Sequence, residues 1–245
     1  TRWGTIGLAS LSALLIAGGG YAVNDYFDHE IDKVNRPLRP IPSGRADRRK
    51  ALYMSLFLFL LGVSLAIPLG LWAILIAIST SVLLYLYSSW FKRQGLVGNL
   101  AVSLSTGLAF LYGAVVGGSP SLGLIPFVFA FLFHLGREVL KDIEDLEGDR
   151  AAGARTIPLR WGERPALNFS AGVFVVLIFL TPFPYVLGVY GIFYLLVVLL
   201  GVDLTLLSLV LWLRRGPLKQ RLVKVNQFLK ADMLVGLLAL YLGRI

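Results

Sequence analysis

The chain has 245 residues, of which 57% are hydrophobic and 15% are charged, and its formal net charge is +9. Its apolar runs recur at the length of about 20 residues that a helix needs to cross a bilayer, which excludes an ordinary soluble globular protein. The absence of cysteine excludes disulfides and thiolate chemistry.

Eight apolar segments follow one another along the chain. In hydrocarbon every backbone N–H and C=O must be satisfied internally, and the alternating pattern of membrane β-strands is absent, so these segments are predicted to be helices. The sequence thus predicts an all-α, polytopic transmembrane bundle that forms a single domain over residues 1–245. The predicted spans are 3–23, 51–67, 69–90, 96–117, 121–140, 165–181, 186–213 and 228–243.

The positive charge is concentrated in the loops that alternate with uncharged turns. Lys and Arg gather at 33–50, 92–93, 137–164 and 214–230, whereas 67–72, 117–122 and 181–190 carry no charge. Short loops rich in Lys and Arg stay in the cytoplasm, so the excess charge indicates membrane orientation and no nucleic-acid partner. This topology places residue 1 outside, and because the chain starts with Thr1 we expect a further helix upstream.

An acidic stretch, NDYFDHEID, directly follows the first predicted span at residues 24–32. Asp25, Asp28 and Asp32 have the spacing DxxDxxxD, which on a helix places them within about 60° of one another on one face. Asn24 lies one step from this arc and could add a neutral oxygen ligand. For a single cluster, a merely solvated helix end is an equal alternative.

The same pattern recurs in KDIEDLEGD at residues 141–149, where Asp142, Asp145 and Asp149 repeat the spacing. Both stretches are followed by Ile-Pro, at residues 41–42 and 157–158. We interpret this as an internal duplication with parallel halves, about 1–117 and 121–245, around a central cleft. Glu144 and Glu147 fall on the opposite side of the second helix. The repetition favours a functional site over two solvated helix ends.

Six carboxylates that face a common cleft call for divalent cations. Ligation by oxygen alone favours Mg²⁺ over zinc or copper, and bound Mg²⁺ would in turn hold a diphosphate. His29 and His134 lack partners at ligand spacing and are interpreted as an interfacial residue and a residue of the bundle. Several cations could bind the remaining phosphate oxygens, or they could serve only as signals of membrane topology. They are Lys92, Lys141, Arg36, Arg39, Arg45 and Arg150.

These motifs resemble the UbiA superfamily of intramembrane prenyltransferases over nearly the whole chain. NDYFDHEIDKVNRPLRPIPSGR resembles its first signature, KDIEDLEGDRAAGARTIPLRWG its second, and YSSWFKRQGLVGN, at residues 87–99, the segment between them. The resemblance implies nine helices where eight are visible. It implies catalytic roles for Asp28, Asp32, Asp145 and Asp149, and Mg²⁺ ligation by Asn24 and these four acids, with Asp25 and Asp142 in support.

The resemblance also implies an activity. Mg²⁺ and the cations would bind a polyprenyl diphosphate donor and stabilise its leaving group, while the apolar bundle keeps water from the carbocation. Asn99 and Ser103 form a predicted polar wall, and aromatic rings near the site could stabilise the cation, although each is more commonly a packing residue. These rings are Tyr85, Tyr87, Phe131 and Phe133. Asp203 is predicted to be the one acid deep in an apolar span, either functional or hydrogen-bonded between helices.

Within the superfamily, the two loops resemble the branch that makes archaeal ether lipids. That resemblance implies a multi-pass protein of the cell membrane, in contact with membrane lipids and with its site at the cytoplasmic face. It implies transfer of a geranylgeranyl group to geranylgeranylglyceryl phosphate. The alternatives are prenylation of an aromatic quinone precursor and, less favoured, a transporter or a lipid diphosphatase. The sequence indicates no oligomeric state.

Overall fold

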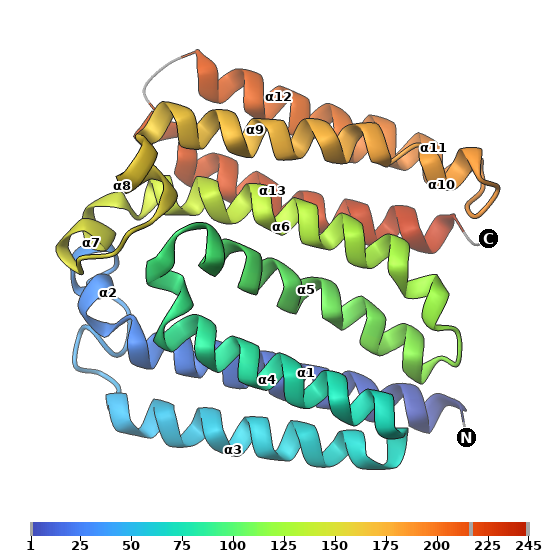
Figure 1. Ribbon diagram of the computed structural model, residues 1–245, viewed down its shortest axis with the longest axis horizontal. Helices are drawn as coiled ribbons and strands as arrows, with labels where there is room; N and C mark the ends of the chain where they lie inside the picture. Colours follow the sequence, from blue (N-terminus) through green and yellow to red (C-terminus); the bar gives the residue numbers. More distant parts are fainter. Residues whose placement is uncertain (1, 216–217, 244–245) are drawn as a thin grey trace.

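The computed structural model describes residues 2–215 and 218–243 as long helices that lie side by side (Figure 1). No strand occurs in this described part of the chain, which confirms the predicted all-α class. The long helices are α1 (Arg2–Phe27), α3 (Arg48–Ala66), α4 (Leu71–Ser89), α5 (Leu96–Val116), α6 (Leu124–Glu144), α9 (Glu163–Leu180), α12 (Leu204–Arg214) and α13 (Leu218–Leu242).

Three short helices gather at one end of the bundle, opposite the end at which both termini lie (Figure 1). They are α2 (His29–Asn35), α7 (Leu146–Ala151) and α8 (Ile157–Trp161). Because the two acidic stretches continue into α2 and α7, this end of the bundle carries the polar residues. The other short elements are η1 (Ile67–Leu69), η2 (Phe91–Gln94), η3 (Pro120–Gly123), α10 (Phe183–Val186), α11 (Ile192–Val197) and the π-helical η4 (Val198–Asp203).

Eight helical stretches in the described residues are long and apolar enough to cross a bilayer, as the sequence predicts. They are Trp3–Phe27, Arg48–Leu69, Leu71–Ser89, Leu96–Val116, Pro120–Glu144, Glu163–Val186, Ile192–Arg214 and Arg221–Leu242. Two predicted boundaries are wrong. The seventh span begins at Ile192 instead of 186, because the chain turns through Gly188 at φ +68°. Helix α13 begins at Leu218 instead of 228, since polar residues continue the helix beyond its apolar part.

The buried apolar side chains form two clusters. One draws on α1, α3, α4 and α5, with Val23, Phe59 and Tyr112 among its members. The other draws on α6, α8, α9 and the elements from α11 to α13, around Phe174 and Leu206. These clusters occupy the two halves in which the acidic motif recurs. The interpretation of the halves as repeats of one domain stays a prediction.

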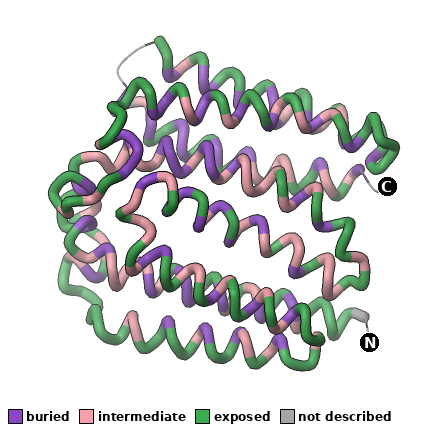
Figure 2. The backbone as a smooth tube through the Cα atoms, viewed as in Figure 1, coloured by how far each residue is buried: buried purple, intermediate pink, exposed green. Residues whose placement is uncertain are grey.

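The outer surface of the bundle is apolar, as a lipid environment requires. Exposed residues cover the outer sides of the helices (Figure 2). They include residues with large apolar side chains, such as Leu60 and Phe179. Small residues bring α1 close to α3, where Ser12 and Ser55 donate hydrogen bonds to the carbonyls of Gly62 and Gly19, at 2.7 and 2.8 Å. Such contacts stabilise helix pairs in membranes and here fix the helix that ends in the first acidic stretch.

Candidate active site

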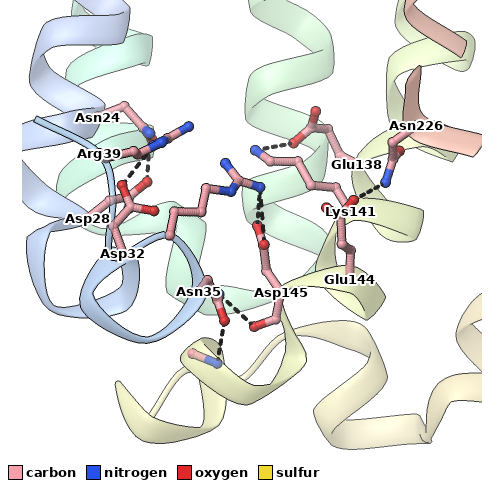
Figure 3. A network of polar contacts seen from close by, with 12 residues as sticks. Asn24, Asp28, Asp32, Asn35, Arg39, Glu138, Lys141, Glu144, Asp145 and Asn226 are labelled. Carbon is pink, nitrogen blue, oxygen red and sulfur yellow. Dashed lines mark hydrogen bonds and ion pairs between the residues drawn. The ribbon is translucent and has the colours of Figure 1, made fainter. Parts of the chain in front are cut away.

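The first acidic stretch lies where α1 ends and α2 begins. Asp28 separates the two helices, and it and Asp32 are almost fully buried, with 3% and 5% of their surfaces exposed. Asn24 lies one turn before Asp28 and donates a hydrogen bond from Nδ2 to Asp28 Oδ2, at 2.6 Å (Figure 3). Two buried carboxylates so close to each other need positive partners, because isolated charges are costly to bury.

Two basic side chains, one from η2 and one from the loop after α2, supply these partners. Lys92 of η2 forms an ion pair with Asp28. Arg39, in the loop after α2, contacts Asp32 at 2.7 Å and Asp25 at 3.3 Å. Most of the predicted first metal cluster is therefore neutralised in this structure by the cations that the sequence predicts as phosphate ligands.

The second acidic stretch lies across from the first, at the end of α6 and the start of α7. Asp145 forms an ion pair with Arg36 at the end of α2, at 3.2 Å between Nη2 and Oδ1. Asp142 accepts a hydrogen bond from Asn99 Nδ2 of α5, at 3.0 Å. Burial raises the pKa of Asp149 to about 6, although the positive charge of Lys92 opposes this shift.

Asn35, next to Arg36, also connects α2 with the second acidic stretch. Its Nδ2 donates to the carbonyl of Asp145 at 3.1 Å, and its Oδ1 accepts from the backbone N–H of Gly148 at 3.0 Å (Figure 3). A Cβ at Gly148 would lie 2.6 Å from Asn35 Cγ, so a larger residue there would displace the Asn35 side chain from this position. We call this contact the Asn35–Gly148 joint; the sequence analysis did not find it.

A cavity of about 600 Å³ extends from this polar end into the bundle. Its sides include apolar residues of α1, α4 and α5, among them Ile16, Leu84 and Leu108. The arrangement thus combines a charged end with an apolar interior. The predicted site residues that line the cavity are Asn24, Asp25, Asp28, Asp32, Arg36, Arg39, Tyr87, Lys92, Lys141 and Asp145.

Six predicted site residues are not among those that line the cavity: Asp142, Asp149, Asn99, Ser103, Arg45 and Arg150. Ser103 donates its hydroxyl hydrogen to the carbonyl of Asn99 one turn earlier, and Asn99 in turn holds Asp142. Arg45 turns back on its own loop, where it bonds Ser43 Oγ and the carbonyl of Leu38. Arg150 is exposed.

Most of the predicted aromatic residues pack against other rings. Tyr87 is buried and lines the cavity. Tyr85 contacts Phe27 edge-on, with ring centroids 5.8 Å apart. Phe131 stacks on Phe127, and Phe133 packs against Phe174. The structure therefore places one of the four rings beside the charged end.

The sequence analysis missed several charged residues that line the cavity. Glu138 of α6 is buried, and it pairs with Arg137 at 2.7 Å and Lys141 at 3.6 Å. It lies one helical turn before Asp142, so the helical spacing used for the aspartates could have found it. Arg137, His134 and Lys230 also line the cavity. His134 was predicted to be an ordinary residue of the bundle.

The prediction that Asp203 is the one acid deep in an apolar span is wrong. Asp232 lies within the last span and has 3% of its surface exposed. It was overlooked because it stands next to the charged start of α13. The predicted alternative for Asp203, a hydrogen bond between helices, is present, since Thr181 Oγ1 donates to Asp203 Oδ2 at 2.8 Å.

The oxygen atoms of the side chains at the charged end are of the type that binds Mg²⁺. Asn24, Asp28, Asp32 and Asp145 present amide and carboxylate oxygens to one cavity, and Mg²⁺ prefers such oxygens. In the described residues, no three His, Cys, Asp or Glu side chains are already arranged around a common ion. Each of these aspartates is instead paired with a Lys, an Arg or Asn24.

A charged cavity at one end of an apolar, membrane-spanning bundle is typical of an intramembrane enzyme that acts on lipids with phosphorylated head groups. The comparisons with known proteins agree with this class. The chain belongs to the UbiA prenyltransferase family, whose profile matches residues 1–230. It is therefore a multi-pass membrane enzyme of the prenyltransferase class, and the resemblance stated from the motifs is confirmed.

Individual members of the family show how similar this chain is to named proteins. The chain is 45% identical to a digeranylgeranylglyceryl phosphate synthase of Methanopyrus kandleri, over 95% of this chain and 84% of the relative. A solved structure described as a digeranylgeranylglyceryl phosphate synthase in membranes is 34% identical, with a TM-score of 0.77 over 96% of this chain and 84% of that one. A UbiA homologue from Archaeoglobus fulgidus, bound to DMAPP and Mg²⁺, shares the fold at 17% identity, with a TM-score of 0.72 over 97% and 88% of the two chains.

Proposed function

We propose that this chain transfers a geranylgeranyl group from geranylgeranyl diphosphate to the free hydroxyl of geranylgeranylglyceryl phosphate. The reaction forms an ether bond and releases diphosphate and a proton. The observation that carries the proposal is the cavity in which acids of both stretches and several cations meet an apolar interior. The relatives that carry the name of this synthase, such as the one from Methanopyrus kandleri, support the choice of acceptor.

The residues that would hold the donor lie at the charged end. Asn24, Asp28, Asp32 and Asp145 would bind Mg²⁺, which supplies positive charge to the leaving diphosphate when bound. Lys92, Arg36 and Arg39 would bind diphosphate oxygens. In the present structure these three cations pair with Asp28, Asp145 and Asp32, so the diphosphate would compete with these aspartates for them.

The cations that remain suit an acceptor with a phosphate of its own. Arg137, Lys141 and Lys230 line the cavity from α6 and α13, and the first two of them share one acid, Glu138. A glycerol phosphate carries about two negative charges and needs such partners, whereas an aromatic acceptor needs mainly a stacking surface. Tyr21, Tyr87 and Tyr112 also line this cavity, so stacking surface is present and the choice of acceptor depends on the cations. Their positive charge favours the lipid phosphate.

The apolar part of the cavity would hold the prenyl chain and limit the access of water. Ile16, Ile76, Leu84 and Leu108 line it, and none of them can activate a water molecule. Exclusion of water would favour capture of the allylic carbon by the acceptor hydroxyl over hydrolysis. This is the property that separates a transferase from a lipid diphosphatase. The basic loops support a location of this end of the bundle at the cytoplasmic face.

A competition assay tests the proposal. The full chain in nanodiscs receives labelled geranylgeranyl diphosphate, Mg²⁺ and equal concentrations of geranylgeranylglyceryl phosphate and 4-hydroxybenzoate. We expect the label in the diether lipid. Label in the aromatic product would refute the proposed acceptor, but it would still be a prenyl transfer. Free labelled prenol as the main product would indicate a diphosphatase. Uptake of label into sealed proteoliposomes of the same protein, without a product, would indicate a transporter.

A further inference from the structure

A second cavity, of about 260 Å³, lies between α5, α6, α9, η4 and α13. Its walls are mostly apolar and include Phe110, Phe133 and Leu177. Thr106 and His134 line both this cavity and the first one, so the two adjoin. None of the acids of the two acidic stretches lines the second cavity. The candidate active site therefore does not account for it.

Two buried acids distinguish this cavity from a packing defect. Asp232 of α13 lines it, is 3% exposed, and has no hydrogen-bond partner on either carboxylate oxygen among the described residues. Asp203, at the end of η4, is 5% exposed and is not itself among the lining residues, but its chain neighbour Val202 and its hydrogen-bond partner Thr181 both line the cavity. Thr181 satisfies Asp203 Oδ2, but Oδ1 has no partner in the described part of the chain.

No Lys or Arg of the described residues lines this cavity. Every ion pair found in residues 2–215 and 218–243 involves other acids. A carboxylate buried in an apolar region costs several kcal/mol unless it is paired or protonated. The cavity also adjoins the π-helical η4, through Val198 and Val202, and such segments are frequent at functional sites. An acid inside a membrane span is itself a reason to look for a ligand.

We propose that this second cavity binds a membrane-soluble primary alkylammonium ion. Its NH₃⁺ group contacts Asp203 and Asp232, and its alkyl chain fills the apolar remainder. The three oxygens without partners, Asp203 Oδ1 and both of Asp232, match the three donors of a primary ammonium group. At roughly 30 Å³ for each water-sized group, the cavity holds a chain of about eight carbons.

Photolabelling tests the proposal on the full chain in nanodiscs. The probe is an eight-carbon amine that carries a diazirine, and the matched probes are the corresponding alcohol and carboxylate. We expect the amine to label peptides of α6 and α13 at least about tenfold more than either matched probe. Asp232→Asn should reduce this labelling at least about tenfold, because breaking a buried charge pair is strongly unfavourable. The exposed acid variant Asp47→Asn should leave it unchanged.

A second pair of variants keeps both acids. Gly236 lines the cavity, and an added Cβ would meet only Val202, at 3.9 Å, so Gly236→Leu should fill the space and reduce labelling. Gly172→Leu, at an exposed position with nothing within 4 Å, should have no effect. Equal labelling by amine and alcohol, or labelling unchanged by Asp232→Asn and Gly236→Leu, would overturn the proposal. So would stabilisation by sodium ions that depends on Asp232, without specific amine labelling.

Discussion

The Asn35–Gly148 joint permits a quantitative prediction about how the two acidic stretches are held together. Asn35→Ala removes two hydrogen bonds, at 3.1 and 3.0 Å, that connect α2 with the start of α7. Each such bond contributes about 0.5–1.5 kcal/mol, so the free energy of unfolding should fall by about 1–3 kcal/mol. Asn168→Ala, which removes only a 3.5 Å exposed contact with Arg214, is the matched control and should cost under about 0.5 kcal/mol.

Gly148→Ala perturbs the same joint from the other side. The new methyl group would lie 2.6 Å from Asn35 Cγ and 2.7 Å from Oδ1, and such overpacking costs about 1–3 kcal/mol. The Asn35→Ala variant lacks the amide group that would clash with the new methyl group. In that background Gly148→Ala should cost under about 0.5 kcal/mol. The two substitutions should therefore be strongly non-additive.

Reversible unfolding in mixed micelles measures these free energies, and prenyl transfer is measured on the same samples. We expect both single variants to lose about tenfold or more of kcat/KM, because a displacement of about 1 Å can cost a factor of 100. Effects on stability that add within about 0.5 kcal/mol would refute the joint as a shared contact. Full activity in Asn35→Ala would show that the distance between the acidic stretches does not depend on it.

Three further outcomes follow from the charged end of the cavity. Asp28→Ala should retain less than about a tenth of the activity in the labelled-donor assay, since lost metal ligands or their close partners cost 10-fold to 100-fold; retention of more would contradict its proposed role. Arg39→Ala should lose at least about tenfold in kcat/KM while Arg45→Ala stays within about twofold, because only Arg39 lines the cavity; equal losses would contradict this assignment. Chelation of divalent ions should abolish transfer and added Mg²⁺ restore it, and activity that survives chelation would exclude Mg²⁺ dependence.

The features that were predicted correctly from the sequence are those that depend on local pattern. Eight spans follow from hydropathy and length, because a helix in lipid satisfies its own backbone. The clustering of Asp28 and Asp32 with Asn24 follows from helical spacing over a few residues. Asp145 lines the same cavity because its stretch ends a helix on the same side of the membrane as the first stretch. The charge of the loops predicts that both stretches lie on one side.

The features that were missed depend on contacts between distant residues. Asn35 and Gly148 are 113 positions apart, and neither belongs to a residue type that signals such a contact by itself. Arg39 and Arg45 lie in one loop and are equivalent by composition, yet the fold of that loop brings only Arg39 to Asp32. Asp232 was missed because charged neighbours concealed a buried position that tertiary packing determines.

The charges of the acids and the cations that line the first cavity nearly cancel. Five acids and six Lys or Arg residues line it, so its charged end is nearly neutral without any bound ion. A nearly neutral site can fold without ligands, because each buried charge has a partner at hand. It cannot also neutralise a diphosphate with several negative charges unless further positive charge arrives. The pairing of Lys92 with Asp28, and of Arg39 with Asp32, is thus itself a physical reason to expect that the donor binds together with divalent cations.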